Sequence, residues 1–206
     1  MCGSGGQQLG RRNGRMALPA QKNGYTFADV LSLEGDERIE LINGEAYRMA
    51  TPSRIHQGIC FELGRQLGNY LEGKQCRAYP APFAVRLFEQ DGERPEEVDS
   101  VVEPDISVVC DRGKLDKYGC RGAPDMVVEV LSPSSLRHDR LVKLNLYQQA
   151  GVREYWIVDP ENRSVQVFLL DSSGFFRICE DYGCRDVAKV NVLDGCFIEL
   201  AKVFSE

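Results

Sequence analysis

The segment Met126–Leu131 constrains the fold of this chain more than any other, because it is apolar throughout except for Glu129. A short apolar run bounded by turn residues is typical of a strand in the middle of a sheet, with both faces covered. Burying a carboxylate in such a strand without a partner costs several kcal/mol. The segment therefore predicts both a central strand and a nearby group that balances the charge of Glu129.

The other apolar patterns predict helices and strands around this strand. The pair Asn43-Gly44 predicts a tight turn between strands at 38–42 and 45–49. Isoleucine and leucine at four-residue spacing predict a long helix from Pro52 to Gly73. Shorter helices are expected at 26–33 and 136–150, and strands at 83–87, 106–110, 155–158, 164–170, 177–179, 187–192 and 197–203. This mixture is typical of an α/β (α+β) domain with a mixed central β-sheet flanked by helices.

The chain length of 206 residues suits one domain with a short extension. Residues 1–24 contain six glycines among mostly polar residues and show no hydrophobic period. Such a composition cannot bury enough apolar surface to offset the entropy of ordering. We therefore expect a flexible N-terminal arm at 1–24 and a single domain at 25–206.

Charge and hydropathy exclude some classes of protein. With 25 Lys and Arg against 31 Asp and Glu, the net charge is -6, which argues against a protein that coats nucleic acid by bulk charge. Nucleic acid remains possible as a substrate, because the carboxylates of a metal site count against the sum. No stretch approaches the roughly 20 apolar residues that cross a bilayer, and the first residues lack the apolar segment of a secretory signal. We expect a cytoplasmic protein without a membrane partner.

The eight cysteines are scattered and form no Cys-x-x-Cys pair, so free thiols are expected rather than a disulfide framework. The two histidines are His56 and His138, and neither lies at ligand spacing from a pair of cysteines, which argues against zinc. Both are expected to be surface or capping residues.

A second acid, Asp105, follows Pro104 at the start of another apolar strand. Two carboxylates at neighbouring strands suit Mg²⁺, which prefers hard oxygen ligands. The simpler alternatives are a turn cap for Asp105 and a structural ion pair for Glu129. Asp125 lies on the same strand face as Glu129, since side chains alternate with a period of two along a strand. It is therefore a reserve ligand, although a capping role suits it better.

The helix after the central strand supplies a cation. Asp139, Lys143 and Tyr147 recur every four residues and therefore share one helix face. If the loop at 132–135 folds this helix back over the strand that carries Glu129, the Lys143 ammonium reaches the same cleft. There it can orient an attacking water or stabilise a developing phosphoryl charge.

With these residues the sequence resembles the Uma2 family of endonucleases, a branch of the PD-(D/E)XK restriction-endonuclease-like superfamily. The resemblance extends over about residues 25–204 and depends on the order and spacing of several pieces, none of which is specific alone. The matching pieces are 40–45, 104–109, 127–134, 139–143 with Tyr147, and 151–160.

The resemblance implies a restriction-endonuclease-like core that hydrolyses DNA phosphodiester bonds with Mg²⁺, for which Mn²⁺ can substitute. It makes Asp105 and Glu129 metal ligands, adds the Val130 carbonyl as a further ligand, and matches Glu40 to an upstream acid that completes such sites. Two-site cleavage in the superfamily implies a homodimer. The superfamily lysine lies two residues after the second acid, where this chain has Leu131, so the resemblance transfers that role to Lys143.

The departure at Leu131 supports a rival interpretation, in which the chain is a catalytically inactive nuclease-fold module for binding or assembly. A hydrolase of smaller phosphoesters is a further alternative. Metal binding without nuclease activity would favour the first, and activity on small phosphodiesters without affinity for nucleic acid at low salt would favour the second.

Overall fold

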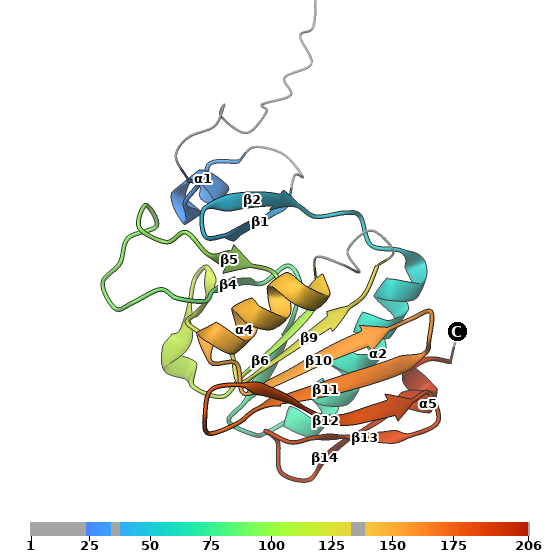
Figure 1. Ribbon diagram of the computed structural model, residues 1–206. Coiled ribbons are helices and arrows are strands. Elements are labelled where there is room, and N and C mark those ends of the chain that lie inside the picture. Colours follow the sequence, from blue (N-terminus) through green and yellow to red (C-terminus); the bar gives the residue numbers. More distant parts are fainter. Residues whose placement is uncertain (1–23, 34–37, 133–138, 206) are drawn as a thin grey trace, which may run out of the picture.

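The computed structural model describes residues 24–33, 38–132 and 139–205, so the predicted arm lies outside the described residues except for Gly24. Within these ranges the main sheet consists of β3 (Arg77–Pro80), β6 (Ile106–Val109), β9 (Met126–Val130), β10 (Glu154–Asp159), β11 (Ser164–Leu170) and β12 (Phe176–Gly183). The strand order is β12-β11-β10-β9-β6-β3 (Figure 1). Strands β9 and β10 are parallel, whereas the other neighbours are antiparallel. The predicted central position of the strand that carries Glu129 is confirmed.

A second sheet consists of β1 (Ile39–Ile42), β2 (Glu45–Arg48), β4 (Ala84–Arg86), β5 (Val101–Val102), β7 (Leu115–Asp116) and β8 (Gly119–Arg121). Its order is β2-β1-β5-β4-β8-β7. The turn between β1 and β2 is the predicted one, since Asn43 and Gly44 have φ angles of 51° and 77°, the left-handed conformation that this hairpin turn requires. The predicted fold class is confirmed, but the sequence patterns did not divide the strands between two sheets.

Helices enclose the main sheet on both faces (Figure 1). On one face α2 (Arg54–Leu71) packs together with the hairpin β13 (Val187–Val190)–β14 (Cys196–Glu199) and α5 (Leu200–Val203), around a core that contains Leu63, Leu67 and Trp156. On the other face α4 (Leu144–Ala150) buries Tyr147 against Tyr155. The central strand β9 is therefore covered on both sides.

The predicted helices are present with changed ends. Helix α1 (Phe27–Leu31) begins with the expected capping box of Thr26 and Asp29. The helix expected at 136–150 consists, where described, of a π-helical turn η2 (Asp139–Lys143) followed by α4, which ends at Gly151 with a φ of 86°. Among the described residues, no helix has the length and apolar character needed to span a membrane.

The strand expected at 197–203 is wrong beyond Glu199, because Leu200–Val203 is helical. Leu200 and Val203 are buried and lie three residues apart, so both face the core on one side of a helix. Their apolar character fitted a strand as well as a helix, and a short apolar segment alone does not distinguish the two.

The prediction that all cysteines are free thiols is wrong for Cys76 and Cys110, which form a disulfide. Cys76 precedes β3 and Cys110 follows β6, and the antiparallel register pairs Arg77 with Val109. This register places the two cysteines opposite each other at the next position. The separation of 34 residues in the sequence conceals this proximity, because it appears only once the two strands have paired.

Candidate metal-binding and catalytic site

The predicted site residues meet at one cavity of about 600 Å³. It lies where β1, β9 and η2 approach the beginning of α2. Its wall includes all five predicted residues, namely Glu40, Asp105, Glu129, Val130 and Lys143. Side chains from positions far apart in the sequence therefore converge on one concave surface, which is the arrangement expected of a ligand or catalytic site.

Glu129 and Lys143 form a buried ion pair at the centre of this group. The Lys143 ammonium lies 2.9 Å from Glu129 Oε1 and 3.0 Å from Glu40 Oε1, so one cation joins two carboxylates. The Tyr147 hydroxyl donates a hydrogen bond of 2.6 Å to the same Glu129 oxygen. Lys143 and Tyr147 are four residues apart and contact one carboxylate, as their spacing predicts.

Asp105 lies beside Glu129 at the edge of the same cavity. The next residue, Ile106, pairs with Val128 across β6 and β9, which brings Asp105 next to the end of β9. Its Oδ2 accepts a hydrogen bond of 2.8 Å from the Val130 amide. The backbone of the neighbouring strand therefore fixes the orientation of this carboxylate.

Two other predicted acids have different positions. Asp125 accepts a hydrogen bond of 2.8 Å from the Cys110 amide and pairs with Arg153 at 3.0 Å, so its contacts are structural and it does not line the acidic cavity. Asp139 begins η2, but its side chain lies outside the described part of the chain.

His56 is a site residue that the sequence reasoning missed. It is only 9% exposed, and its Nε2 lies 3.3 Å from Asp105 Oδ2. The expectation of a surface or capping residue is therefore wrong. Ile59, Leu63 and Leu67 define the buried face of α2, and His56 precedes Ile59 by three residues. That spacing was the available signal, because residues three apart share a helix face.

The environment of His56 has opposing effects on its proton affinity. Burial lowers the pKa of the imidazole, but hydrogen bonding to Asp105, the charge of Asp105 and a hydrogen bond to the Val130 backbone raise it, and the net direction is upward. A hydrogen bond that favours the protonated ring is one that the ring donates, so the Val130 partner is its carbonyl. The imidazole thus faces the same carboxylate and carbonyl that were expected to hold a cation.

The cavity carries more negative than positive charge. Glu40 and Glu129 contact the Lys143 ammonium. The wall has five carboxyl groups and three cationic side chains, namely Glu40, Asp105, Glu129, Asp159 and Glu161 against Arg38, Arg48 and Lys143. Burial raises the pKa of Glu129 to about 8; Lys143 opposes this shift, and the charges of Asp105 and Glu40 add to it. Burial also raises the pKa of Tyr147, which therefore remains a phenol and a hydrogen-bond donor. A divalent cation would relieve this excess of negative charge.

The raised pKa of Glu129 predicts how the stability of the metal-free protein depends on pH. The folded protein holds the proton up to about pH 8, whereas the unfolded chain releases it near the ordinary value of 4.5. This contribution to stability is complete below the unfolded pKa and is lost as the pH rises through about 8. Urea unfolding in the presence of a chelator would measure this. Between pH 5 and pH 9 the free energy of unfolding should fall more steeply for the wild type than for Glu129→Gln. Parallel curves would contradict the shift.

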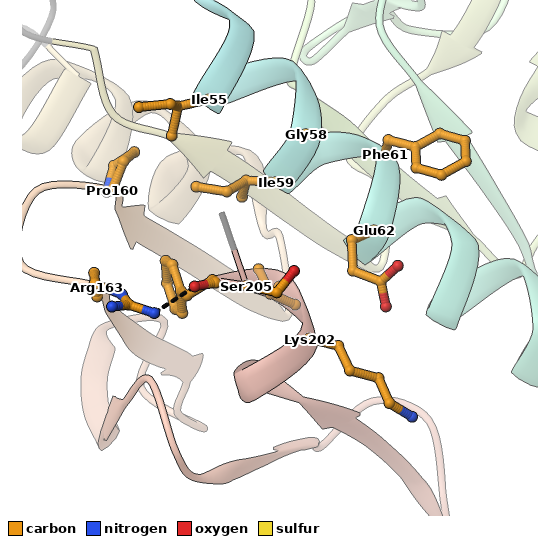
Figure 2. A pocket seen from close by; sticks show the side chains of 11 residues that line it. Ile55, Gly58, Ile59, Phe61, Glu62, Pro160, Arg163, Lys202 and Ser205 are labelled. Carbon is orange, nitrogen blue, oxygen red and sulfur yellow. Dashed lines mark hydrogen bonds between the residues drawn. The ribbon is translucent and has the colours of Figure 1, made fainter.

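A second cavity, of about 240 Å³, lies between α2 and the end of the chain near α5 (Figure 2). Its wall is mixed, with apolar side chains such as Ile55, Ile59 and Pro160 beside the charged Glu62, Arg163 and Lys202. The Arg163 guanidinium donates to the Phe204 carbonyl. Glu62 is engaged by Arg65 at 2.6 Å, so no group of acids comparable with the first cavity is present among its described residues.

The residues of the larger cavity fit a hard divalent cation. Asp105 and Glu129 supply carboxylate oxygens and Val130 supplies a backbone carbonyl, all on the wall of one cavity with excess negative charge. Carboxylates and carbonyls are the ligands that Mg²⁺ and Mn²⁺ accept in proteins. The donor set therefore supports the metal assignments that the sequence suggested.

Comparison with known proteins places this site in a family. The family model Uma2, described as "Putative restriction endonuclease", matches residues 27–194. Two uncharacterised proteins of Synechocystis sp. are similar: slr1290 is 26% identical over 139 residues (67% of this chain and 69% of the relative), and sll1609 is 25% identical over 149 residues (70% and 80%).

A solved structure shares the fold. The crystal structure of a "putative nuclease belonging to DUF820" from Anabaena variabilis superimposes with a TM-score of 0.67 at 19% identity, over 88% of this chain and 98% of that one. The family model covers residues 27–194, which include β1, α2, β6, β9 and η2, the elements that form the acidic cavity. The chain therefore belongs to the Uma2 family.

Proposed function

We propose that this protein is a Mg²⁺-dependent endonuclease that hydrolyses DNA phosphodiester bonds at the acidic cavity. The observation that carries the proposal is a buried lysine paired with two buried carboxylates, with the half-buried Asp105 on the wall of the same cavity. The family model that the chain matches is described as "Putative restriction endonuclease". Phosphodiester hydrolysis needs a cation near the phosphate and a polar group near the attacking water, and this cavity offers residues for both.

Asp105 and Glu129 would hold the cation, with the Val130 carbonyl as a further ligand. Bound Mg²⁺ would supply Lewis acidity toward the scissile phosphate and lower the pKa of a water molecule. The hydrogen bond from the Val130 amide orients Asp105, and that from Tyr147 orients Glu129. Preorganised ligands of this kind avoid the cost of rearranging the site during the reaction.

Lys143 would take the role of the superfamily lysine. Leu131 occupies the usual lysine position but is 4% exposed and packs in the apolar core beneath α4. Lys143 reaches Glu129 from η2 instead, and Glu40 accepts a hydrogen bond of 3.0 Å from the same ammonium. From this place Lys143 can donate a hydrogen bond to the attacking water or to a charged phosphoryl oxygen, and Glu40 acts as its positioning residue.

The proposal includes a homodimer, because cutting both strands of a duplex is most direct with two active sites. Light scattering of the purified protein alone and with a short duplex would measure the oligomeric state. A monomer in both conditions would remove this part of the proposal and leave the single-site chemistry intact.

The decisive experiment is a cleavage assay at low salt with supercoiled plasmid and with single-stranded DNA, together with a calorimetric titration of Mg²⁺. We expect cleavage that requires Mg²⁺ or Mn²⁺ and stops on addition of EDTA. Cation binding without cleavage of either DNA would instead favour the inactive binding module. Hydrolysis of bis(p-nitrophenyl) phosphate without affinity for DNA would favour a hydrolase of smaller phosphoesters.

A further inference from the structure

The first turn of α2 brings an imidazole to the place where the cation is expected. His56 Nε2 lies 3.3 Å from Asp105 Oδ2, and the ring also contacts the Val130 backbone. Potential ligand atoms of His56, Cys60 and Asp105 all lie within 4.8 Å of one another. An oxygen and a nitrogen ligand this close can bind one metal ion together without a change in the fold.

The second ring nitrogen of His56, Nδ1, contacts the Cys60 side chain. His56 Nδ1 lies 3.5 Å from the Cys60 sulfur, one helical turn further along α2. Burial, together with the charges of Asp105 and Glu129, raises the pKa of Cys60 beyond the usual range of thiols, so this residue remains a neutral thiol. Histidines that bind metals are commonly oriented by a partner on the second nitrogen, and Cys60 occupies that position here.

We propose that His56 is a fourth protein ligand of the catalytic cation, and that it raises the affinity of the site for a first-row transition ion such as Mn²⁺ relative to its affinity for Mg²⁺. Imidazole nitrogen suits transition metals, whereas Mg²⁺ favours a shell of oxygen atoms and retains its waters. The inference rests on the proposed function, because it assigns His56 to the same cation that Asp105 and Glu129 would bind. Cys60 supports the ring and is not itself a ligand.

The test is electron spin-echo spectroscopy of the full-length protein loaded with Mn²⁺, which detects a nitrogen nucleus bound to the ion. We expect ¹⁴N modulation in the wild type and in Cys60→Ser, and its loss in His56→Gln. Binding titrations should show that Mn²⁺ affinity falls by roughly 10- to 100-fold or more in His56→Gln. Losses of that size already follow when a residue that hydrogen-bonds to a metal ligand is removed, so loss of a ligand itself should cost no less. Mg²⁺ affinity should fall less, because glutamine offers an oxygen in place of the nitrogen.

The outcomes separate this inference from the proposed function. Bound Mn²⁺ without ¹⁴N modulation in the wild type would overturn the role of His56. This outcome is read from the wild-type protein alone, so it holds even if the His56→Gln variant does not fold. If Mn²⁺ affinity falls in Asp105→Asn and Glu129→Gln but not in His56→Gln, the carboxylate site stands and the inference fails. If the wild type binds no Mn²⁺, both fail.

Discussion

Asp105→Asn is expected to lower the rate of Mg²⁺-dependent DNA cleavage at least about a thousandfold, a loss of about 4 kcal/mol of transition-state stabilisation. The substitution keeps the size of the side chain but replaces a charged oxygen ligand by a neutral amide, so the cation is held less tightly. Cleavage of plasmid DNA under single-turnover conditions, at saturating and at limiting Mg²⁺, would measure the effect.

Asp125→Asn is a closely matched control. Like Asp105, Asp125 accepts a hydrogen bond of 2.8 Å from a backbone amide of a neighbouring strand in the main sheet. Unlike Asp105, it does not line the acidic cavity and pairs instead with Arg153. Asp125→Asn should therefore lose as much stability as Asp105→Asn through its weakened bond to a backbone amide, but it should still cleave DNA. Equal rates for the two variants would remove Asp105 from the catalytic site.

Lys143→Met should lower the free energy of unfolding by about 3–5 kcal/mol at a pH above the Glu129 pKa of about 8, the usual cost of removing one partner from a buried ion pair. The apolar stem is largely retained, but Glu129 and Glu40 lose their shared cation in a region where both are less than a tenth exposed. Chemical denaturation of the metal-free protein would measure the loss.

Two further variants identify its cause. Lys143→Met combined with Glu129→Gln should lose less stability than the sum of the two single changes, because one of the carboxylates left unpaired is then neutral. Lys202→Met removes an exposed lysine that pairs with Glu199 at 2.6 Å, and should cost at most about 1 kcal/mol. Additive effects in the double variant would mean that the ammonium and Glu129 are not energetically coupled.

Local patterns were sufficient to point to Asp105, Glu129 and Lys143, whereas Glu40 was assigned only through the resemblance to the family. Glu129 is evident as the single charge of an apolar strand, and Lys143 follows from helical spacing, because both signals lie within a few residues. Spacing identified the ammonium even though η2 is a π-helical turn, since Tyr147 still contacts the same carboxylate as Lys143.

The parts that were missed depend on strand pairing and on packing between layers. His56 meets Asp105 only because α2 packs against the main sheet, where it contacts β3 and β9, and Cys76 meets Cys110 only because β3 pairs with β6. The partners are separated by dozens of residues, so no local period links them. The division of the strands into two sheets was missed for the same reason.

The position of Lys143 has a consequence for sorting the members of this family into active and inactive proteins. A search pattern that requires a lysine two residues after the second acid would reject this chain, since Leu131 occupies that place. An ammonium nevertheless lies 2.9 Å from Glu129, supplied by the helical turn η2 rather than by the strand itself. Homologues are better grouped by whether any lysine can reach the second acid in space than by the linear motif.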